Sequence, residues 1–331
     1  MKDRRDGASR ESDVSIGAPR RLGIVGAGPV GTALAVAAAR AGWPVTAFAT
    51  RDTGRRAAFE SLVPGALAVA SPAEVAAHAD VTFITVPDDE IAAVAAQIHA
   101  DQDQVLAHTS GLLGSDVLRA VGSGHSGHSG QSGHSGHSGH SDGPALGAFH
   151  PLVSFTADVE RSVAAMRGAT AAIEGDDSAV DVLAALAVAI GAVPLRLPRG
   201  AKPIYHAAAV LASGGLIALL DAIATLGAAA GMSEAESLAV YGRLVEQTMA
   251  NARATGIAPA LTGPITRGDA GTLESHLAAL RAVAPDVVEI YLAAARRELE
   301  ITRERGALSP DQVSRVGDVL AKDRRPGTIY R

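Results

Sequence analysis

A strand–glycine–helix element near the N-terminus constrains the fold of this chain more than any other feature. The apolar run 22–25 predicts a short strand, the run Gly26-Ala27-Gly28-Pro29-Val30-Gly31 follows it directly, and a helical pattern fills 30–41. In this context the first glycine permits a tight turn, the second lets the backbone approach a pyrophosphate, and the third lets the helix pack close to the strand. We therefore predict a dinucleotide site, with phosphates on the free N–H groups of the helix, at Gly26, Gly28, Pro29, Val30 and Gly31.

Strand and helix patterns alternate from this element to residue 198. Further strand-like runs fall at 45–49, 66–70, 81–86, 105–107, 146–149, 169–173 and 193–197. Such alternation is typical of a parallel sheet covered on both faces. Beyond residue 198 the pattern predicts helices alone, a long one over about 203–230 and others that begin near 233, 272, 286 and 310. The expected fold class is α/β, with a Rossmann-type parallel sheet domain over 21–198 followed by an all-α C-terminal domain over 199–331.

Two segments have compositions that cannot build a packed core. Residues 1–20 are polar, charged and rich in glycine and serine, and predict a disordered tail. Residues 122–143 repeat His-Ser-Gly with five regularly spaced histidines, and predict a disordered insert at the rim of the sheet. Metal capture by these imidazoles is the alternative interpretation of the insert. We predict no functional metal site.

Composition and charge exclude several classes of protein. A net charge of −6 argues against nucleic-acid binding, which needs a clustered basic face. The absence of cysteine excludes disulfides and thiolate catalysis. The N-terminus lacks the apolar core of a signal peptide, and the apolar stretch 207–230 is interrupted by Ser213, Gly214 and Asp221, which favours a buried core helix over a membrane span. We expect a soluble cytoplasmic protein that binds neither nucleic acid nor membranes.

The end of the second predicted strand indicates which dinucleotide binds. An NAD site usually places Asp or Glu about 20 residues past the glycine motif, where it holds the ribose 2′-hydroxyl. Here the strand ends in Thr50-Arg51, and the first carboxylate, Asp52, comes after the arginine. A guanidinium group binds a 2′-phosphate bidentately. We therefore predict NADP(H) as the cofactor, with Thr50 and Arg51 in its site.

The strand predicted at 81–86 ends in Val86-Pro87-Asp88. The carboxyl ends of strands in open α/β sheets line the ligand crevice, so we expect Val86 and Pro87 beside the nicotinamide. For Asp88 we expect a different role, as the cap of the helix that follows.

Polar side chains that can do chemistry follow two other strands and open the long helix. His108 and Ser110 come directly after one strand, and His150 after another, so we expect them to line the cofactor cleft. Lys202, Tyr205 and His206 lie within about one helical turn and can project toward the same cleft.

Hydride transfer to a carbonyl needs a proton donor, which Lys, His or Tyr can supply. The candidate catalytic residues are Lys202, His206, Ser213 and His150. For each of them a purely structural role, at a turn, a helix start or in the core, is the alternative.

A Gly-Pro-rich break at 261–269 interrupts the helical region, and such irregularities often carry function. Thr262 and Arg267 are the candidate substrate-binding residues, since an arginine can hold a carboxylate. An ordinary turn with an Arg–Asp pair is the alternative.

Four motifs together carry a resemblance to a known family. They are His108-Thr109-Ser110-Gly111, Phe149-His150-Pro151-Leu152, Tyr205-His206-Ala207-Ala208-Ala209 with Ala212-Ser213, and Leu261-Thr262-Gly263-Pro264 with Arg267-Gly268-Asp269. With them the chain resembles, over roughly residues 20–320 without the histidine repeat, the two-part family of a Rossmann-like domain followed by "domain of unknown function 2520". That family looks like a branch of the 6-phosphogluconate-dehydrogenase-like superfamily, whose members include ketopantoate reductase, pyrroline-5-carboxylate reductase and prephenate dehydrogenase.

The resemblance implies an NADP-binding domain, a helical C-terminal domain that commonly dimerises, and a small-molecule substrate in a cleft between them. We therefore expect a homodimer. Some members are thought to act in pantothenate synthesis, so the leading specific expectation is reduction of a small 2-oxo acid such as ketopantoate. The family usually has Asn after the serine of the long helix, where this chain has Gly214. An imine reductase of the pyrroline-5-carboxylate reductase type, a non-catalytic NADP(H)-binding protein and a deazaflavin partner for NADP are the alternatives.

Overall fold

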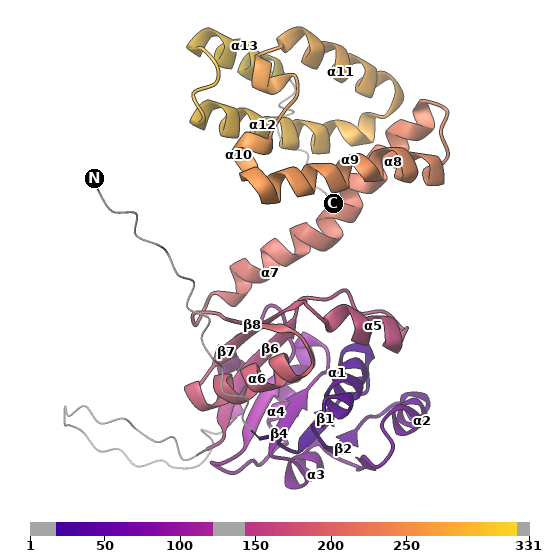
Figure 1. Ribbon diagram of the computed structural model, residues 1–331, viewed down its shortest axis with the longest axis vertical. Helices are drawn as coiled ribbons and strands as arrows, with labels where there is room; N and C mark the ends of the chain where they lie inside the picture. The colour runs from indigo at the N-terminus through magenta and orange to yellow at the C-terminus, as the bar shows by residue number, and fades with distance from the viewer. Residues whose placement is uncertain (1–17, 122–142, 323–331) are drawn as a thin grey trace, which may run out of the picture. The chain divides into compact units, whose positions relative to one another are not determined.

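The computed structural model describes residues 18–121 and 143–322, and the chain divides into two units after Val210 (Figure 1). The predicted insert at 122–143 and the tail at 1–20 lie almost wholly outside the described residues. The division comes later than the predicted boundary at 198, because helix α7 (Lys202–Val210) packs on the first unit, where the side chain of Lys202 is fully buried.

The first unit is built on an eight-stranded sheet with the order β3-β2-β1-β4-β5-β6-β7-β8. Its strands are β1 (Leu22–Val25), β2 (Val45–Ala49), β3 (Leu67–Ala68), β4 (Val81–Ile84), β5 (Val105–His108), β6 (Ala145–Pro151), β7 (Thr170–Gly175) and β8 (Val193–Arg196). The predicted parallel pairing is confirmed from β3 through β6. β7 pairs antiparallel with β6, and β8 runs parallel to β7. The carboxyl ends of β1, β2, β4, β5 and β6 therefore share one edge of the sheet.

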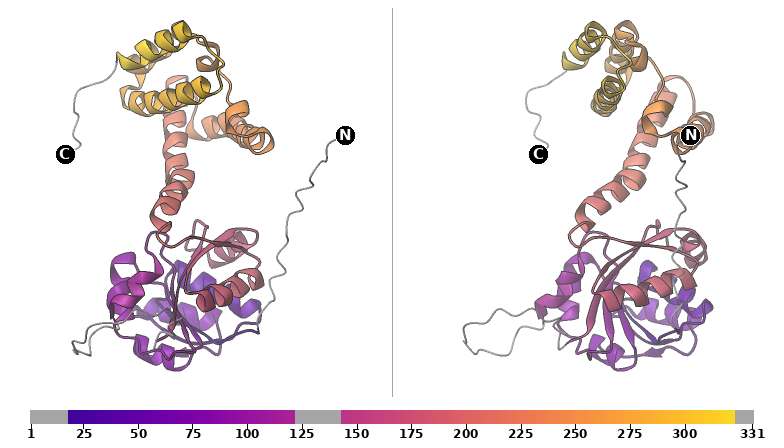
Figure 2. Two further views of the ribbon diagram at one scale, coloured as in Figure 1. Left: turned by 90° about the vertical axis from the view of Figure 1, so that its left-hand side faces the viewer. Right: turned by 60° about the vertical axis from the view of Figure 1, so that its left-hand side comes forward.

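Helices cover both faces of this sheet (Figures 1 and 2). One face carries α1 (Pro29–Arg40), α5 (Val159–Met166) and α6 (Asp177–Ala189). The other carries α3 (Pro72–Ala77), the 3₁₀ segment η1 (Asp88–Glu90) that leads into α4 (Ile91–Ala95), and η2 (Ser115–Val121). Helix α2 (Thr53–Leu62) follows β2 and buries Phe59 on Phe48, with the ring centroids 4.2 Å apart.

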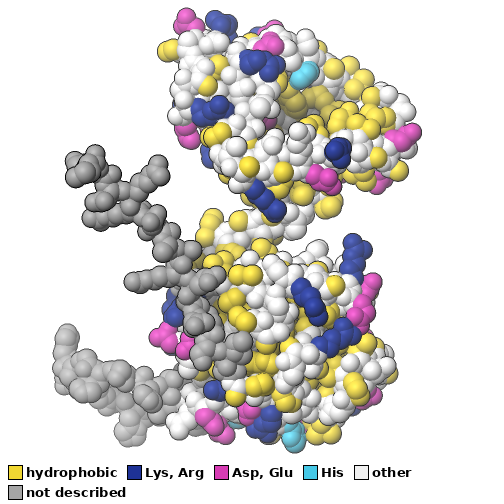
Figure 3. All heavy atoms as spheres, in the orientation of Figure 1, with side chains coloured by type: hydrophobic (Ala, Val, Ile, Leu, Met, Phe, Trp, Pro, Cys, Tyr) yellow, Lys and Arg dark blue, Asp and Glu magenta, His cyan; other side chains and the backbone are white. Residues whose placement is uncertain are grey.

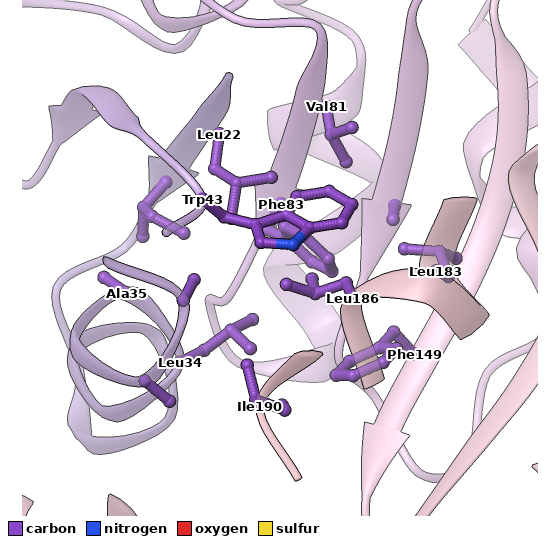
Figure 4. Packing of buried hydrophobic residues seen from close by; sticks show 14 of the residues in the cluster. Leu22, Leu34, Ala35, Trp43, Val81, Phe83, Phe149, Leu183, Leu186 and Ile190 are labelled. Atoms are coloured by element: carbon purple, nitrogen blue, oxygen red, sulfur yellow. The ribbon is translucent and has the colours of Figure 1, made fainter. Parts of the chain in front are cut away.

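Aromatic side chains organise the larger core of the first unit. Trp43 is 2% exposed and lies among Leu22, Val81 and Phe83 (Figure 4). Phe83 meets Phe149 edge to face with the ring centroids 5.7 Å apart, a favoured aromatic geometry. This packing fixes β1, β4 and β6 relative to one another, and with them the edge of the sheet where the polar side chains lie.

The second unit is helical. It consists of the π-helical turn η3 (Leu211–Gly215), α8 (Leu216–Ala229), α9 (Glu234–Thr255), α10 (Ile257–Ala260), η4 (Ile265–Arg267), α11 (Ala270–Val283), η5 (Pro285–Val287), α12 (Val288–Glu304) and α13 (Pro310–Ala321). Capping boxes start α9 at Ser233 and α13 at Ser309, since each serine and the Glu or Gln three residues later bond reciprocally. Its core is made chiefly by α11, α12 and α13.

The helical run Lys202–Ala229 differs from its prediction as a buried core helix. None of its most apolar 18-residue stretch is buried in this chain, and Leu211 and Ile217 are 73% and 66% exposed. Few of its side chains, Leu226 among them, reach the core of the second unit. Figure 3 shows apolar side chains spread over the surface of that unit. Among the described residues this run, whose most apolar 18-residue stretch has a mean hydropathy of 2.0, is the one helix that length and composition would allow to cross a membrane.

Candidate functional site

A cavity of about 840 Å³ opens at the carboxyl ends of β1, β2 and β4. Of the predicted cofactor residues, eight line it: Gly26, Gly28, Pro29, Val30, Thr50, Arg51, Val86 and Pro87. Gly31 lies beneath the cavity, where a Cβ would come 2.2 Å from the Gly26 carbonyl oxygen and 2.3 Å from Thr85 Oγ1. A Cβ on Gly28 would meet nothing within 4 Å, so the space above this residue is open. Gly26 has a φ of +106°, which favours glycine at the turn.

The start of α1 is suited to an anion. Gly28 is the N-cap, and no described side chain caps the helix. The backbone N–H of Thr32 bonds the Gly28 carbonyl, whereas the N–H groups of Val30 and Gly31 precede the first intrahelical bond. Exposed N–H groups at a helix start, with the positive end of the helix dipole, bind phosphate.

Arg51 lies at the rim of the cavity with 86% of its side chain exposed, and it pairs with Glu90. Asp52, the first carboxylate after the strand, is used elsewhere, since it caps α2 by accepting from the Arg55 backbone N–H at 3.0 Å. This hydrogen bond lowers the pKa of the Asp52 carboxyl. Arg56 donates to the Val69 carbonyl at 3.2 Å and does not line the cavity. The cavity lining therefore holds the Arg51 guanidinium together with the carboxylates of Asp52 and Glu90, and each of these carboxylates already has a partner within the protein.

The expectation that Asp88 caps a helix is wrong. Neither η1 nor α4 receives a side-chain cap bond, and Asp88 Oδ2 instead accepts from Ser110 Oγ at 2.8 Å. The reason is topological, because β4 and β5 are neighbours and their carboxyl ends bring the two side chains together. This bond joins the cofactor edge to the polar segment that follows β5.

His108 and Ser110 organise that segment and do not line the cavity. His108 is fully buried, with Nδ1 accepting from the Ser110 N–H at 3.2 Å and Nε2 at 3.1 Å from the Gly114 carbonyl oxygen. Burial lowers the pKa of His108 to about 4. Ser110 Oγ accepts backbone N–H bonds from Leu112 and Leu113 at 3.1 and 2.9 Å. The segment is thus held by its own polar side chains.

The structure brings His150, Tyr205 and His206 together, but none of the three lines the cavity at the ends of β1, β2 and β4, toward which the sequence analysis expects them to project. The Tyr205 hydroxyl lies 3.3 Å from His150 Nδ1, and the ring of His150 meets the rings of Tyr205 and His206 edge to face, with both centroid distances 5.8 Å. Gly111 borders this cluster, since a Cβ there would come 2.3 Å from His206 Nδ1 and 2.9 Å from His150 Nε2. His206 Nδ1 is buried and has no hydrogen-bond partner among the described residues.

Burial controls the protonation of this cluster. It lowers the pKa of His150 to about 4, and the nearby Lys202 and His206 act in the same direction. His150 is therefore neutral at pH 7. Burial raises the pKa of Tyr205, which keeps its hydroxyl proton at neutral pH. The cluster thus combines a neutral imidazole with a protonated phenol.

Lys202 is fully buried, and its amine donates to the Ser110 carbonyl oxygen. Burial lowers the pKa of Lys202 to about 8, while Glu174 and Asp88 oppose that shift. Sequence reasoning missed Glu174, which is 1% exposed near the end of β7. Its partner Ser115 lies 59 residues away in the chain, so no local pattern could have revealed the pair.

The other candidate residues belong to the second unit. Ser213 lies in the π-helical turn η3, beside Gly214. Thr262 precedes η4 and Arg267 ends it, and both side chains are exposed. Asp269 caps α11 by accepting from the Thr272 N–H at 3.0 Å. Within residues 18–121 and 143–322, no cluster of three or more His, Cys, Asp or Glu side chains could hold a metal ion.

Comparison with known proteins gives two family matches. Residues 6–126 match the family model of the Rossmann-like domain, and residues 169–298 match that of the domain of unknown function DUF2520. None of the curated proteins is similar enough in sequence to match the chain.

Solved structures share the fold of the chain. A candidate NADP oxidoreductase from Bacteroides fragilis is 21% identical, with a TM-score of 0.64 over 85% of this chain and 98% of that one. An imine reductase from Aspergillus terreus is 16% identical, with a TM-score of 0.62 over 91% and 100% of the two chains. A pyrroline carboxylate reductase from Plasmodium falciparum, solved with NADP bound, is 14% identical, with a TM-score of 0.53 over 86% and 98%. At these identities the likeness establishes the fold. The two matches together give the arrangement that the sequence resembles, a Rossmann-like domain over residues 6–126 followed by the domain of unknown function 2520 over residues 169–298.

Proposed function

We propose that this protein is an NADP(H)-dependent oxidoreductase that reduces a carbon–oxygen or carbon–nitrogen double bond of a small substrate. The observation that carries the proposal is the cavity at the carboxyl ends of β1, β2 and β4. Three features occur together there: the open space above Gly28, the uncapped start of α1 and the exposed side chain of Arg51. A pyrophosphate suits the first two features and a 2′-phosphate suits the third. The solved oxidoreductases with the same fold support this cofactor.

A bound nicotinamide would supply the hydride, and the chain must supply the proton. Tyr205 is the best donor, because its hydroxyl is protonated at neutral pH and lies 3.3 Å from His150 Nδ1. In its Nδ1–H tautomer the neutral imidazole of His150 would donate a hydrogen bond to the phenolate that forms. His206 is the second candidate, because its buried Nδ1 lacks a partner among the described residues. Lys202 is buried and bonded to Ser110, so we assign it a positioning role.

Two substrate classes remain for this site. The first is a small 2-oxo acid such as ketopantoate; Thr262 and Arg267 of the second unit stay the proposed carboxylate-binding residues on their side-chain chemistry alone. The second is a cyclic imine of the pyrroline-5-carboxylate kind, supported by the imine reductase and the pyrroline carboxylate reductase that share the fold. An iminium already carries its proton, so imine reduction demands less of a side-chain acid.

The cofactor assignment is tested by titrating the purified protein with NADPH and, separately, with NADH. We expect NADPH to bind more tightly. Arg51→Ala should weaken NADPH binding by about 10- to 150-fold, because a hydrogen bond to a charged group contributes about 1.5–3 kcal/mol, and should leave NADH binding unchanged. Arg56→Ala is the matched control, since this arginine bonds the Val69 carbonyl instead. Equal affinity for both dinucleotides, unchanged in Arg51→Ala, would refute the assignment of NADP(H).

The substrate class is tested by turnover of NADPH with a panel of 2-oxo acids and a panel of cyclic imines. Tyr205→Phe should lower kcat for oxo acids by about 10²–10⁴-fold, the usual contribution of general acid catalysis. A much smaller loss, with turnover confined to imines, would favour the imine reductase. Tight NADPH binding without turnover of either panel would favour a non-catalytic NADP(H)-binding protein.

We further propose that a second copy of the chain covers the apolar helical run Lys202–Ala229, so that the soluble cytoplasmic protein is a homodimer. Leu211 and Ile217 of this run are exposed, and on the neighbouring helix α9 the side chains of Leu244 and Met249 are 58% and 53% exposed. Several exposed apolar side chains on adjacent helices are typical of an interface. A membrane fits this run less well, since Lys202 at its start is buried in the first unit and the run carries an exposed Asp221.

Light scattering on the purified protein tests the dimer. Wild type should have twice the mass of one chain, and Ile217→Asp should have the mass of one chain. The control Leu67→Asp, which changes an exposed leucine of β3, should leave the dimer intact. A wild-type protein with the mass of a single chain would refute the dimer.

A further inference from the structure

Two side chains of opposite charge, Glu174 and Lys202, are buried in the first unit, and both bond residues of segment 110–115. Glu174 on β7 is 1% exposed and Lys202 on α7 is fully buried. The Glu174 carboxylate accepts two hydrogen bonds from Ser115, whose N–H donates to Oε2 and whose hydroxyl donates to Oε1, both at 3.1 Å. Both of these donors belong to a neutral residue. A carboxylate this deeply buried is costly unless an opposite charge compensates it.

The charged and titratable groups around Lys202 identify the compensating charges. Glu174 and Asp88 favour its protonated form, and the larger of the two effects comes from Glu174. His108 and His150 also face it, but burial lowers the pKa of each to about 4, so both are neutral at pH 7. Asp88 is exposed at the surface, which leaves Glu174 as the buried counter-charge among these groups.

Both members of the pair hold one segment, residues 110–115. Lys202 donates to the Ser110 carbonyl at its start, and Glu174 receives the two hydrogen bonds of Ser115 at its end. Two positions of this segment, Gly111 and Gly114, leave little room for a side chain. A Cβ on Gly114 would come 3.1 Å from Glu174 Oε2, and one on Gly111 would come 2.3 Å from His206 Nδ1. The segment is therefore held by hydrogen bonds at both ends, and Gly111 packs against the imidazole rings of His150 and His206.

We propose that Glu174 is a positioning residue: its buried carboxylate balances the charge of Lys202, and the two side chains together fix segment 110–115 against His150 and His206. The clamp stands on the hydrogen bonds of Lys202 and Glu174, and the charge balance stands on the burial of both side chains together with the electrostatic effect of Glu174 on Lys202. Their consequence for turnover rests on the proposed oxidoreductase function.

The composition of the chain makes the charge balance directly measurable. The sequence has three lysines, Lys2, Lys202 and Lys322. In the full-length protein labelled with ¹³C in lysine, the Lys202 side-chain signal is identified by elimination with Lys2→Arg and Lys322→Arg. Its chemical shift against pH gives its titration midpoint without any substrate or cofactor.

Glu174→Gln keeps the shape of the side chain and removes its charge. We expect it to lower the Lys202 midpoint by about one pH unit, the lower end of what an opposite charge contributes. Asp177→Asn is the matched control, because this carboxylate lies three positions along the chain, is 85% exposed and pairs with Arg196. It should leave the midpoint unchanged. A midpoint that is unchanged in Glu174→Gln would overturn the proposal.

A second variant covers the case in which Glu174→Gln does not fold. Removing both charges in Glu174→Gln with Lys202→Met should restore folding, because neither charge is then left buried without its partner. Failure of the double variant to fold where wild type folds would also overturn the proposal.

Kinetics separate positioning from mere stability. If wild type turns over an oxo acid or an imine, Glu174→Gln should bind NADPH within about twofold of wild type while kcat falls about tenfold or more, as expected when a reacting group is slightly misplaced. An equal kcat in a variant with a lowered Lys202 midpoint would refute the positioning role. If wild type shows no turnover, the NMR titration still decides the charge balance, so failure of the proposed function and failure of this inference are distinguishable.

Discussion

Gly28→Ala should separate folding from cofactor binding. Gly28 has φ −76° and ψ −179°, an extended conformation that alanine adopts readily, and a Cβ there would meet nothing within 4 Å. Replacing glycine by alanine at such a position stabilises a protein by about 0.4–1 kcal/mol, since the unfolded chain loses conformational freedom, but Gly28 is the N-cap of α1, where glycine is preferred over alanine. These two effects oppose each other, so the melting temperature should change by no more than about 4 °C.

The same methyl group should weaken NADPH binding. It would occupy the space above α1 that we assign to the pyrophosphate, and one extra methyl in a packed contact costs about 1–3 kcal/mol. That cost corresponds to about 5- to 150-fold in Kd. Thermal unfolding and a fluorescence titration with NADPH measure the two effects on one preparation.

Gly31→Ala is the contrasting variant. Its Cβ would come 2.2 Å from the Gly26 carbonyl oxygen and 2.3 Å from Thr85 Oγ1, so it should lower both stability and affinity. A Gly28→Ala protein that melts within about 4 °C of wild type and binds NADPH as tightly as wild type would refute the position assigned to the pyrophosphate.

Three further predictions concern stability. The pKa of His108 is about 4 in the fold against 6.5 when free, so keeping this imidazole neutral contributes about 3 kcal/mol to the free energy of unfolding above pH 6.5, and this contribution is lost as pH falls toward 4. Urea unfolding at a series of pH values should show this loss of stability, and the loss should be less steep in His108→Gln. Ser110→Ala removes a hydroxyl that accepts two backbone N–H bonds and should cost about 1–3 kcal/mol in the same assay, so an unchanged free energy of unfolding would contradict the role of this hydroxyl. Gly227→Ala would bring a Cβ 2.0 Å from Ser237 Oγ where α8 meets α9, and should lower the helical melting temperature; an unchanged melt would show that this crossing readily adjusts.

Local patterns predict much of the fold. The glycine element, the alternation of strands and helices, and the helix starts near 233 and 310 depend on residues close in sequence, and the structure has all of them. The antiparallel direction of β7 could not be predicted in this way. Strands of this sheet are buried on both faces, so their apolar runs are the same for either direction.

In the candidate site, too, some features follow from local sequence and others depend on residues distant in the chain. The positions of Arg51, His150, Tyr205 and His206 follow from strand ends and helix spacing. The bond between Asp88 and Ser110 and the burial of Glu174 depend on partners 22 and 59 residues away. The sequence also did not predict the exposure of the helical run 202–229. An apolar pattern predicts that a helix face is buried, but it does not indicate whether this chain or another molecule buries it.

The buried tryptophan has a practical consequence. Trp43 is the single tryptophan of the sequence and lies in the core of the first unit, among Leu22 and Phe83. Intrinsic tryptophan fluorescence therefore reports the Rossmann unit alone, whereas circular dichroism at 222 nm reports the helices of both units. Recording the two signals during one thermal ramp would resolve the stability of each unit in the intact chain, without labels and without separating the domains.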